Sequence, residues 1–452
     1  KLMRALTEVE LRIRLKALES IERYGGVEKR HKPDGVHEIT NIRLRNPIYG
    51  YLIMFENKLY ILWNELNSFE IEHRIVDVIE RYKRGEKVEV EVNEYEVDRE
   101  YERLWLEVPL PAGASKLLGG RGKAPVALFR NLGWLLSDDS RYGLVHISNN
   151  PGQTAVRIFD WIAIAMYAKG GLQSSPLVFK FTVHQATKSR TGINPSIEVW
   201  PIGTTVEIIK TAYNQFGIVL GKPERTIAHG YTVLKALRGE AFKREGSIHV
   251  VDDVGAWIAF SVIVTTFVLG DGHIKPIEFV VVTKFSSGNA PKGEAVGIKE
   301  LAKALGGATV RKEVYLQGWH MRLLLPVPPT PAFEKTVKLY KALVNYPVAA
   351  VVEIDGTTYL LSHRITGQFT IGKEKATELY EAVKRFGIKM KVKKDVFALR
   401  YTQLLELAKH VPVRLLNDLE KDTIKEVKSV SSPDLEAVKR VLYEVAKMAR
   451  IT

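Results

Sequence analysis

The residues with the clearest chemical potential are cationic and aromatic side chains on two predicted β-hairpins. These cationic side chains are Lys188, Arg190, Lys284, Arg311, Lys312, His320 and Arg322. A strand presents every second side chain on one face, so such residues can face a nucleic-acid groove. Tyr315 and Trp319 are interleaved with them and could stack on bases or pack in a core. A solvated surface explains any single one, but the set favours a binding face.

The charge of the whole chain agrees with a polyanionic partner. Among 452 residues, 66 are Lys or Arg and 52 are Asp or Glu, which gives a net charge of +14. Basic side chains that neutralise phosphates release condensed counterions, so this excess favours nucleic acid. The sign of the charge carries no specificity, and a basic surface kept for solubility remains the alternative.

Several enzyme classes are excluded or disfavoured. The chain has no Cys, which excludes disulfides, thiolate zinc sites and Cys nucleophiles. The segment 119–124 is Gly-rich, but Leu117 and Ala124 stand where a phosphate loop needs Gly and Ser or Thr, so a flexible basic loop is expected. No His-Glu-x-x-His spacing occurs, which disfavours a catalytic zinc. The absence of Cys with abundant Lys, Glu, Val and Ile is typical of a thermophile.

The sequence predicts a cytoplasmic protein without a membrane partner. The longest apolar segments, Trp257–Leu269 and Ile277–Val282, are shorter than a membrane span. The first residues lack the apolar core of a signal peptide.

A hairpin, a helix and a strand follow one another twice, in 49–92 and in 348–394. The first copy has strands at 51–55 and 59–63, a helix at 71–82 and a strand at 87–92. The second has strands at 350–354 and 358–361, a helix at 374–386 and a strand at 389–393. Tyr60 and Tyr359 occupy matching positions, which favours a divergent repeat over two unrelated modules. The last strand is acidic in the first copy and basic in the second, at Lys389, Lys391 and Lys393.

The middle of the chain begins with an apolar helix that follows Asp253, a plausible N-cap, and ends at Gly270-Asp271-Gly272. A strand at 277–283, a helix at 297–305, a hairpin at 309–325 and a helix at 333–345 are predicted after it. The helix end, Phe267-Val268-Leu269-Gly270-Asp271-Gly272-His273-Ile274, resembles the motif of the LAGLIDADG homing endonucleases. The order of elements after it is also similar to that family's half-domain.

This resemblance implies two helices packed across a pseudo-dyad, with sheets that form a saddle on a duplex. It also implies that Asp271 holds a divalent cation, such as Mg²⁺, for strand cleavage. A turn-forming Asp between glycines is the alternative interpretation of Asp271.

A second motif helix is expected at 161–168, where Trp161-Ile162-Ala163 echoes Trp257-Ile258-Ala259. Lys169-Gly170-Gly171 follows it in place of Gly-Asp-Gly. A Lys does not ligate a cation, although it could take the cation's place facing a phosphate. One of the two expected carboxylates is therefore missing, which argues against double-strand cleavage.

These features predict an α/β (α+β) protein with a pseudo-symmetric, LAGLIDADG-like αββαββα core flanked by β-hairpin–helix modules. The expected divisions are an N-terminal module (1–105), a Gly/Pro-rich connector (106–155), two halves of the core (156–250 and 251–345) and a basic C-terminal module (346–452). A monomer with internal pseudo-two-fold symmetry is expected.

The expected function is binding of structured RNA, a ribosome or duplex DNA, with nuclease activity lost or impaired. An active metal-dependent endonuclease or nickase that uses Asp271 is one alternative. A ribosome-associated inhibitor or hibernation factor is the other.

Overall fold

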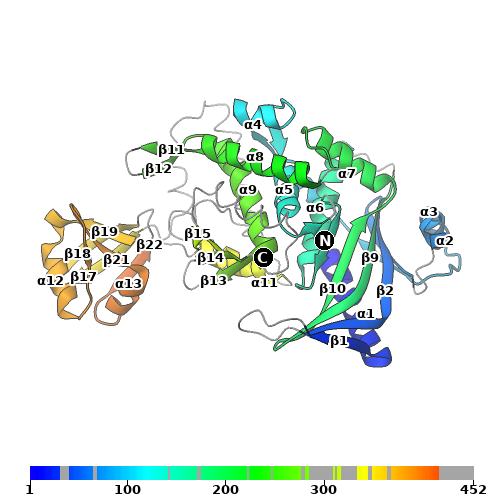
Figure 1. Ribbon diagram of the computed structural model, residues 1–452, viewed down its shortest axis with the longest axis horizontal. Coiled ribbons are helices and arrows are strands. Elements are labelled where there is room, and N and C mark those ends of the chain that lie inside the picture. The colour runs from blue at the N-terminus through cyan, green and yellow to red at the C-terminus, as the bar shows by residue number, and fades with distance from the viewer. Residues whose placement is uncertain are drawn as a thin grey trace. The chain divides into compact units, whose positions relative to one another are not determined.

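The computed structural model shows a mixed α+β protein with antiparallel sheets, which confirms the expected class (Figure 1). It describes residues 1–30, 40–64, 69–140, 143–169, 175–220, 223–245, 248–275, 280–284, 309–310, 313–316, 333–344, 349–363 and 368–416. The chain divides into two compact units. Unit 1 is Lys1–Val233 with Thr330–Glu334, and unit 2 is Leu234–Pro329 with Lys335–Thr452.

Unit 1 is built on one eight-stranded sheet with helices packed against it. Its helices are α1 (Leu2–Tyr24), α2 (Phe69–Glu72), α3 (Ile75–Lys83), α4 (Ala112–Leu117), α5 (Val126–Leu136), α6 (Gln153–Ala168), α7 (Thr204–Asn214), the start of α8 (Pro223–Ala241) and the 3-10 turn η1 (Glu100–Trp105). Its large sheet contains β1 (Gly26–Arg30), β2 (Thr40–Phe55), β3 (Lys58–Trp63), β4 (Val92–Glu96), β7 (Asp139–Ser140), β8 (Val145–Ser148), β9 (Leu177–Ser189) and β10 (Gly192–Pro201), and β5 (Glu107–Pro109) pairs with β6 (Lys123–Pro125) separately.

The strand order of the large sheet is β4-β3-β2-β9-β10-β8-β7, with β1 also paired to β2. The central antiparallel pair, β2 and β9, joins Thr40 to Lys188 at one end and Met54 to Leu177 at the other. Segments expected to form separate divisions, 1–105, 106–155 and 156–250, therefore contribute strands to the same sheet. The long strands β2, β9 and β10 curve together in Figure 1.

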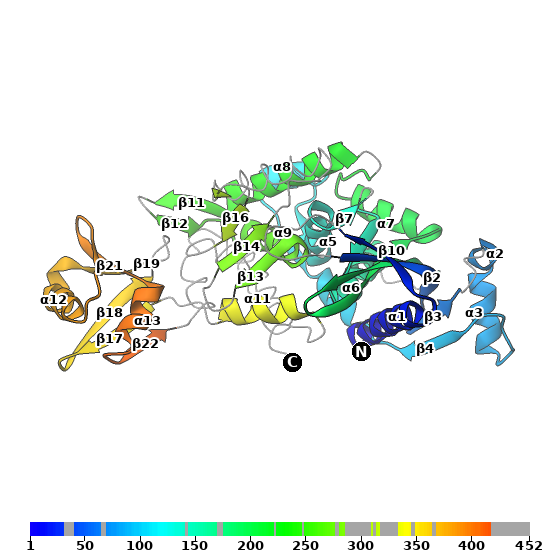
Figure 2. The same cartoon turned by 60° about the horizontal axis from the view of Figure 1, so that its bottom comes forward.

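Helices α1 and α6 cover one face of this sheet and contact each other. The Trp161 ring of α6 stacks on Phe179 of β9, with ring centroids 5.9 Å apart. Gly50 of β2 is required on this face, because a Cβ there would lie 2.3 Å from the Phe181 ring. Figure 2 shows α1 running along the strands. The smaller helices α2 and α3 pack on the opposite face, over Tyr51, Ile53, Tyr60 and Leu62.

A fully buried polar network joins α5, α6 and the edge strands β7 and β8. Arg157 forms a two-pronged ion pair with Asp139, with its Nη2 2.8 Å from Oδ2, and His146 Nδ1 lies 3.0 Å from Oδ1 of the same carboxylate. Asp160 accepts from Arg130 Nε at 2.8 Å and from Trp134 Nε1 at 2.7 Å. Because each carboxylate oxygen has a donor, we interpret this network as structural.

Glu10 of α1 connects the two helices through the start of α6. Its Oε1 accepts from the amide of Ala155 at 2.9 Å, and its Oε2 accepts from the amide of Gly152. A helix N-terminus exposes free amides and positive partial charge, so a buried carboxylate satisfies both. Arg14 pairs with Glu10 at 3.1 Å and donates to the carbonyls of Pro195 and Asn150.

The segment 106–155 is an integral part of unit 1 and not only a connector. Helix α5 is buried along its whole length, since its residues fill the space beside α6. The Gly-rich segment 119–124, expected as a flexible basic loop, packs against the end of α7: Gly119 adopts a positive φ of 73° beside Gln215 and Gly217. Arg121 Nε also donates to Gln215 O at 2.8 Å.

Unit 2 contains the apolar helix that ends in the predicted motif. Its elements before residue 345 are the end of α8, β11 (Phe242–Glu245), β12 (Ile248–Val251), α9 (Val254–Asp271), β13 (Gly272–Lys275), β14 (Val280–Lys284), β15 (Thr309–Val310), β16 (Glu313–Leu316) and α11 (Glu334–Val344). Asp253 is the N-cap of α9, as predicted, and accepts from the amide of Ala256 at 2.8 Å. The sheet order β13-β14-β16-β15 follows the helix. The predicted helix at 297–305 lies outside the described residues.

Helix α9 is longer than the sequence suggested. Its 18 residues, Val254–Asp271, make it the one described helix long and apolar enough to cross a membrane, which corrects the shorter limit of Trp257–Leu269. Within the protein 94% of that window is buried. A buried core helix meets the same criteria of length and composition as a membrane span.

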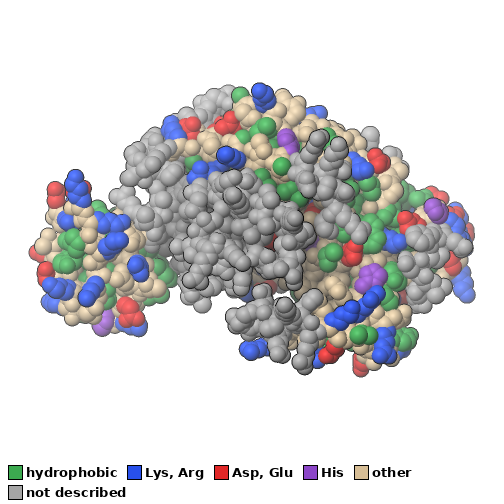
Figure 3. All heavy atoms as spheres, viewed as in Figure 1, with side chains coloured by type: hydrophobic (Ala, Val, Ile, Leu, Met, Phe, Trp, Pro, Cys, Tyr) green, Lys and Arg blue, Asp and Glu red, His purple; other side chains and the backbone are tan. Residues whose placement is uncertain are grey.

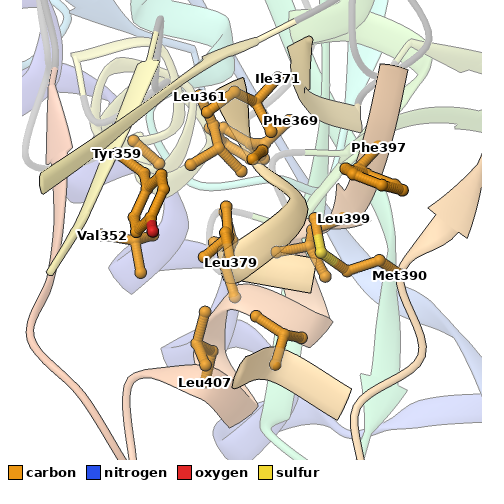
Figure 4. Packing of buried hydrophobic residues seen from close by; sticks show 14 of the residues in the cluster. Val352, Tyr359, Leu361, Phe369, Ile371, Leu379, Met390, Phe397, Leu399 and Leu407 are labelled. Carbon is orange, nitrogen blue, oxygen red and sulfur yellow. The ribbon is translucent and has the colours of Figure 1, made fainter. Parts of the chain in front are cut away.

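The C-terminal sheet has the order β20-β21-β19-β18-β17-β22. Its elements are β17 (Ala349–Ile354), β18 (Thr357–His363), β19 (Gln368–Gly372), η3 (Lys373–Lys375), α12 (Thr377–Arg385), β20 (Lys391–Val392), β21 (Val396–Arg400), α13 (Tyr401–Leu407) and β22 (Val413–Leu416). Leu379 of α12 and Leu407 of α13 pack with strand residues such as Leu361 and Leu399 (Figure 4). The expected strand at 389–393 is limited to two residues, and β19 and β21 form the main pair there.

The two predicted modules share three details of geometry. Their hairpin turns place an acidic residue at positive φ, Glu56 at 56° and Asp355 at 50°. Each acid pairs with a cation at the end of the module's helix: Lys83 with Glu56 at 3.1 Å, and Arg385 with Asp355 at 2.9 Å. A glycine with a φ of 77° follows each helix, at positions 85 and 387. These matches support an internal repeat, although the described residues of the first module contain no counterpart of β19.

The strand after the first module's helix begins later than expected. The predicted strand at 87–92 is β4, Val92–Glu96, and the predicted helix at 71–82 is divided into α2 and α3.

Candidate nucleic-acid interface

The strands β2, β9 and β10 extend beyond the helices α2 and α3, and they present a polar face there. Along β2, Ile42 and Leu44 are buried while Arg43 and Arg45 are exposed. Successive side chains of a strand point to opposite faces, so the two arginines lie opposite the helix-covered side. Within the described part of the chain neither arginine has an ion-pair partner, so both guanidinium groups are available to an anion.

An irregularity in β9 adds two more side chains to this face. The pairing register shifts so that Ser196 faces Gln185 while Ile197 faces Val183, which leaves His184 as the extra residue of a β-bulge. His184 and Gln185 are consequently both exposed. The ring of Tyr49 on β2 meets His184 edge-on, with centroids 5.6 Å apart. We call Arg43, Arg45, Tyr49, His184 and Gln185 the open sheet face.

The open sheet face is bounded by a buried ion pair near the other end of the strands. Lys180 of β9 lies 3.3 Å from Glu72 and between the rings of Tyr51 and Trp200, at 5.7 and 5.9 Å from their centroids. Burial, followed by the charge of Glu72, raises the pKa of Tyr51 to about 12. Lys180 therefore serves internal packing, and the accessible cations are those nearer the hairpin tip.

Two of the three predicted contact residues of unit 1 lie at this tip. Lys188 is exposed near the end of β9 and pairs with Glu28 at 3.4 Å, while Arg190 is exposed in the turn between β9 and β10. Figure 3 shows Lys and Arg side chains beside a His over these strands. The structure thus places Lys188 and Arg190 next to the open sheet face, on the same strand pair.

Lys169, expected to face a phosphate, makes an internal contact instead. It follows α6, and its Nζ donates to the carbonyl of Ser175 at 2.7 Å. Burial lowers the pKa of its ammonium. This hydrogen bond joins the end of α6 to Ser175, two residues before β9, and a phosphate contact by Lys169 stays a prediction.

The predicted contacts of the second hairpin are only partly described. Lys284 is the last residue of β14 and pairs in register with Glu313, but its side chain lies outside the described residues. Arg311, Lys312, His320 and Arg322 also lie outside them. Their role as nucleic-acid contacts remains a prediction.

The C-terminal lysines are placed on a second basic surface. Lys389 and Lys391 are exposed, and Lys393 is half-buried where its amide donates to Val396 O. Within the described residues these three ammonium groups form no ion pairs. Figure 3 shows several Lys and Arg side chains on this part of the protein. The expectation that the C-terminal module is the more basic copy is consistent with this placement.

Asp271, the predicted metal ligand, is the last residue of α9 and is half-buried. Beside it the ammonium of Lys335 donates to the carbonyls of Gly270 at 2.6 Å and Leu269 at 3.2 Å. This cation compensates the negative end of the α9 dipole. Among the described residues no three His, Asp or Glu side chains are grouped to hold a metal. Within the described part of the chain, a single carboxylate near an ammonium does not provide the several oxygen ligands that a Mg²⁺ site needs.

The residues of the open sheet face were missed in the sequence because their strand was assigned too short. A signal was present: Ile42-Arg43-Leu44-Arg45 alternates apolar and cationic side chains. Pairing of β2 with β9 then brings this pattern beside the hairpin that the sequence did identify.

Comparison with family models, with curated proteins and with solved structures gives no match to this chain. Function is therefore inferred from the geometry of the chain itself.

Proposed function

We propose that this protein binds structured RNA or duplex DNA through the open sheet face of unit 1, with nuclease chemistry lost or impaired. The observation that carries the proposal is the pair Arg43 and Arg45, exposed beside Tyr49 and His184 on long antiparallel strands. Cations positioned on a sheet contact phosphates, and the interleaved aromatic and amide groups contact bases. The net charge of +14 supports the same partner.

The arrangement of unit 1 supports a pseudo-two-fold relation, although between different helices from those expected. Helix α1 leads through β1 to the hairpin β2–β3, and helix α6 leads to the hairpin β9–β10. The two helices contact each other, and β2 and β9 pair antiparallel at the centre of the sheet. The sequence had paired α6 with α9, which belongs to unit 2. We therefore propose that the saddle expected from the LAGLIDADG resemblance corresponds to α1, α6 and their hairpins.

This assignment also favours binding over cleavage. The chain after α1 reads Tyr24-Gly25-Gly26, and after α6 it reads Lys169-Gly170-Gly171. Neither helix ends in the acid that the resemblance requires for metal-dependent cleavage. A scaffold that keeps its cations but lacks its acids retains the means of binding only.

The test is to incubate the purified full chain with duplex DNA and with structured RNA, with and without Mg²⁺, and to measure binding and product size. We expect salt-sensitive binding with intact nucleic acid. Cleavage that needs Mg²⁺ and disappears in Asp271→Asn would overturn the view that nuclease chemistry is lost. Failure to bind either nucleic acid would overturn the proposal as a whole.

A further inference from the structure

A polar groove lies between α1 and the segment of β2 that is outside its ladders with β1 and β3, and Tyr49 of the open sheet face contributes to its lining. Strand β1 pairs with Thr40–Leu44, and β3 pairs with Gly50–Phe55, so 45–49 lie between the two ladders. The groove has a volume of about 830 Å³ and is lined by the last two turns of α1, by Asn46–Tyr49 and by the end of β3. It is large enough for one or two nucleotides.

The lining of the groove provides stacking surfaces and a free cation. Tyr24 at the end of α1 is 49% exposed, and the guanidinium of Arg23 lies 6.0 Å from its ring centroid. Arg23 is itself exposed and has no ion-pair partner within the described residues. An aromatic ring beside a planar guanidinium is a typical platform for an unpaired base.

Glu19 and Glu22 also line the groove, while Lys16 and Ser20 are engaged in contacts that give it its shape. Lys16 lies 3.8 Å above the centroid of the Trp63 ring and 2.9 Å from Glu91. Ser20 Oγ donates to the carbonyl of Asn46 at 2.5 Å. These contacts hold α1 against the bulge in β2, so Tyr24 and Tyr49 are the rings left at the surface of the groove.

Tyr49 links the groove to the proposed binding face. Its side chain lines the groove and also meets His184 of the open sheet face. A nucleic-acid strand that contacts Arg43 and Arg45 can therefore continue past Tyr49 into the groove. Base-paired nucleotides do not fit this path, because stacking on Tyr24 requires a base whose faces are not covered by its neighbours.

We infer that the groove between α1 and residues 46–49 of β2 binds unpaired nucleotides that continue from the segment held on the open sheet face. This inference deepens the proposed function and depends on it. It specifies the substrate as nucleic acid with a single-stranded stretch, such as a loop, a bulge or an end, and it assigns base stacking to Tyr24 and Tyr49.

The test compares two labelled probes, a 5′-overhang duplex and a blunt duplex of the same paired sequence, as RNA and as DNA. Fluorescence anisotropy gives the affinity of the full chain and of three variants. Tyr24→Ala removes the exposed ring. Leu15→Ala is the matched control, since Leu15 lies on the same helix, is 48% exposed and does not line the groove. The double variant Arg43→Ala/Arg45→Ala removes the cations of the open sheet face.

Tyr24→Ala should weaken binding of the overhang probe by about tenfold, the scale of one lost base stack, and should leave the blunt probe unchanged. Arg43→Ala/Arg45→Ala should weaken both probes, and Leu15→Ala neither. Equal affinity of Tyr24→Ala and wild type for the overhang probe, with the arginine variant weakened, would overturn the groove assignment alone. Absence of binding by the wild-type chain would overturn the proposed function together with it.

Discussion

The exposed cations of the open sheet face predict how strongly the binding affinity depends on salt concentration. Each phosphate contact on duplex DNA contributes about 0.9 to the slope of log affinity against log salt concentration. Arg43 and Arg45 are exposed and free of ion pairs in the described part of the chain, so replacing both with Ala should lower that slope by about 1.8. When the salt concentration rises from about 50 to about 200 mM, the ratio of wild-type affinity to variant affinity should then fall by about twelvefold.

The assay is anisotropy titration of a labelled duplex at four or more salt concentrations. The control removes the same net charge at cations that are already neutralised, Arg84 beside Glu86 at 2.7 Å and Arg99 beside Glu102 at 2.5 Å. Arg84→Ala/Arg99→Ala should leave the slope near the wild-type value. If the two double variants lower the slope equally, net charge governs binding and the open sheet face has no special role. An unchanged slope in Arg43→Ala/Arg45→Ala refutes the phosphate contacts directly.

Three further predictions concern stability. Asp160→Ala should lower the free energy of unfolding in urea by about 3–5 kcal/mol, because it leaves Arg130 buried without its partner. Adding Arg130→Met should recover part of that loss. Strictly additive losses from the two substitutions would contradict the pairing. Burial raises the pKa of Asp253, so its negative charge opposes folding at neutral pH. Asp253→Asn keeps the helix cap and should raise the melting temperature at pH 7. This gain in melting temperature should shrink as the pH falls through the Asp pKa range, because the wild-type carboxylate then becomes protonated. Lys335→Met should lower thermal stability by about 1–3 kcal/mol because it removes a charged donor from the end of α9, and Lys335→Arg should lower it less; circular dichroism melts that coincide with wild type would exclude this role.

Local patterns in the sequence predicted the elements that need only neighbouring residues. The hairpin with strands at 51–55 and 59–63 and the N-cap Asp253 follow from alternation, turn chemistry and capping. Both are present, as the β2–β3 hairpin and the start of α9. Boundaries moved by a few residues where tertiary pairing extends a strand, as in β2, which begins at Thr40 because β1 and β9 pair with its first half.

Contacts between distant segments were not predictable in the same way. Pairing of β2 with β9 joins residues more than a hundred positions apart, and no local signal specifies it. The polar network has the same character: Arg157, Asp139 and His146 come from different elements and look like ordinary surface residues in the sequence. Only the fold shows that each is buried and paired. The Gly-rich appearance of 106–155 concealed α5, in which every residue is buried, including the polar Arg130 and Asn131.

The motif resemblance implies cleavage of nucleic acid, whereas the side chains at the helix ends favour binding. Cleavage of a phosphodiester by the mechanism that the motif implies needs carboxylates that hold a cation against the phosphate. The helix ends of unit 1 carry Tyr24 and Lys169 instead, and the Asp271 end of α9 carries the ammonium of Lys335. An ammonium attracts phosphate as a metal ion does, but it neither activates water nor accepts several ligands. We therefore propose a binding protein, because these helix ends carry groups that can contact nucleic acid but lack the set of carboxylates that metal-dependent cleavage needs.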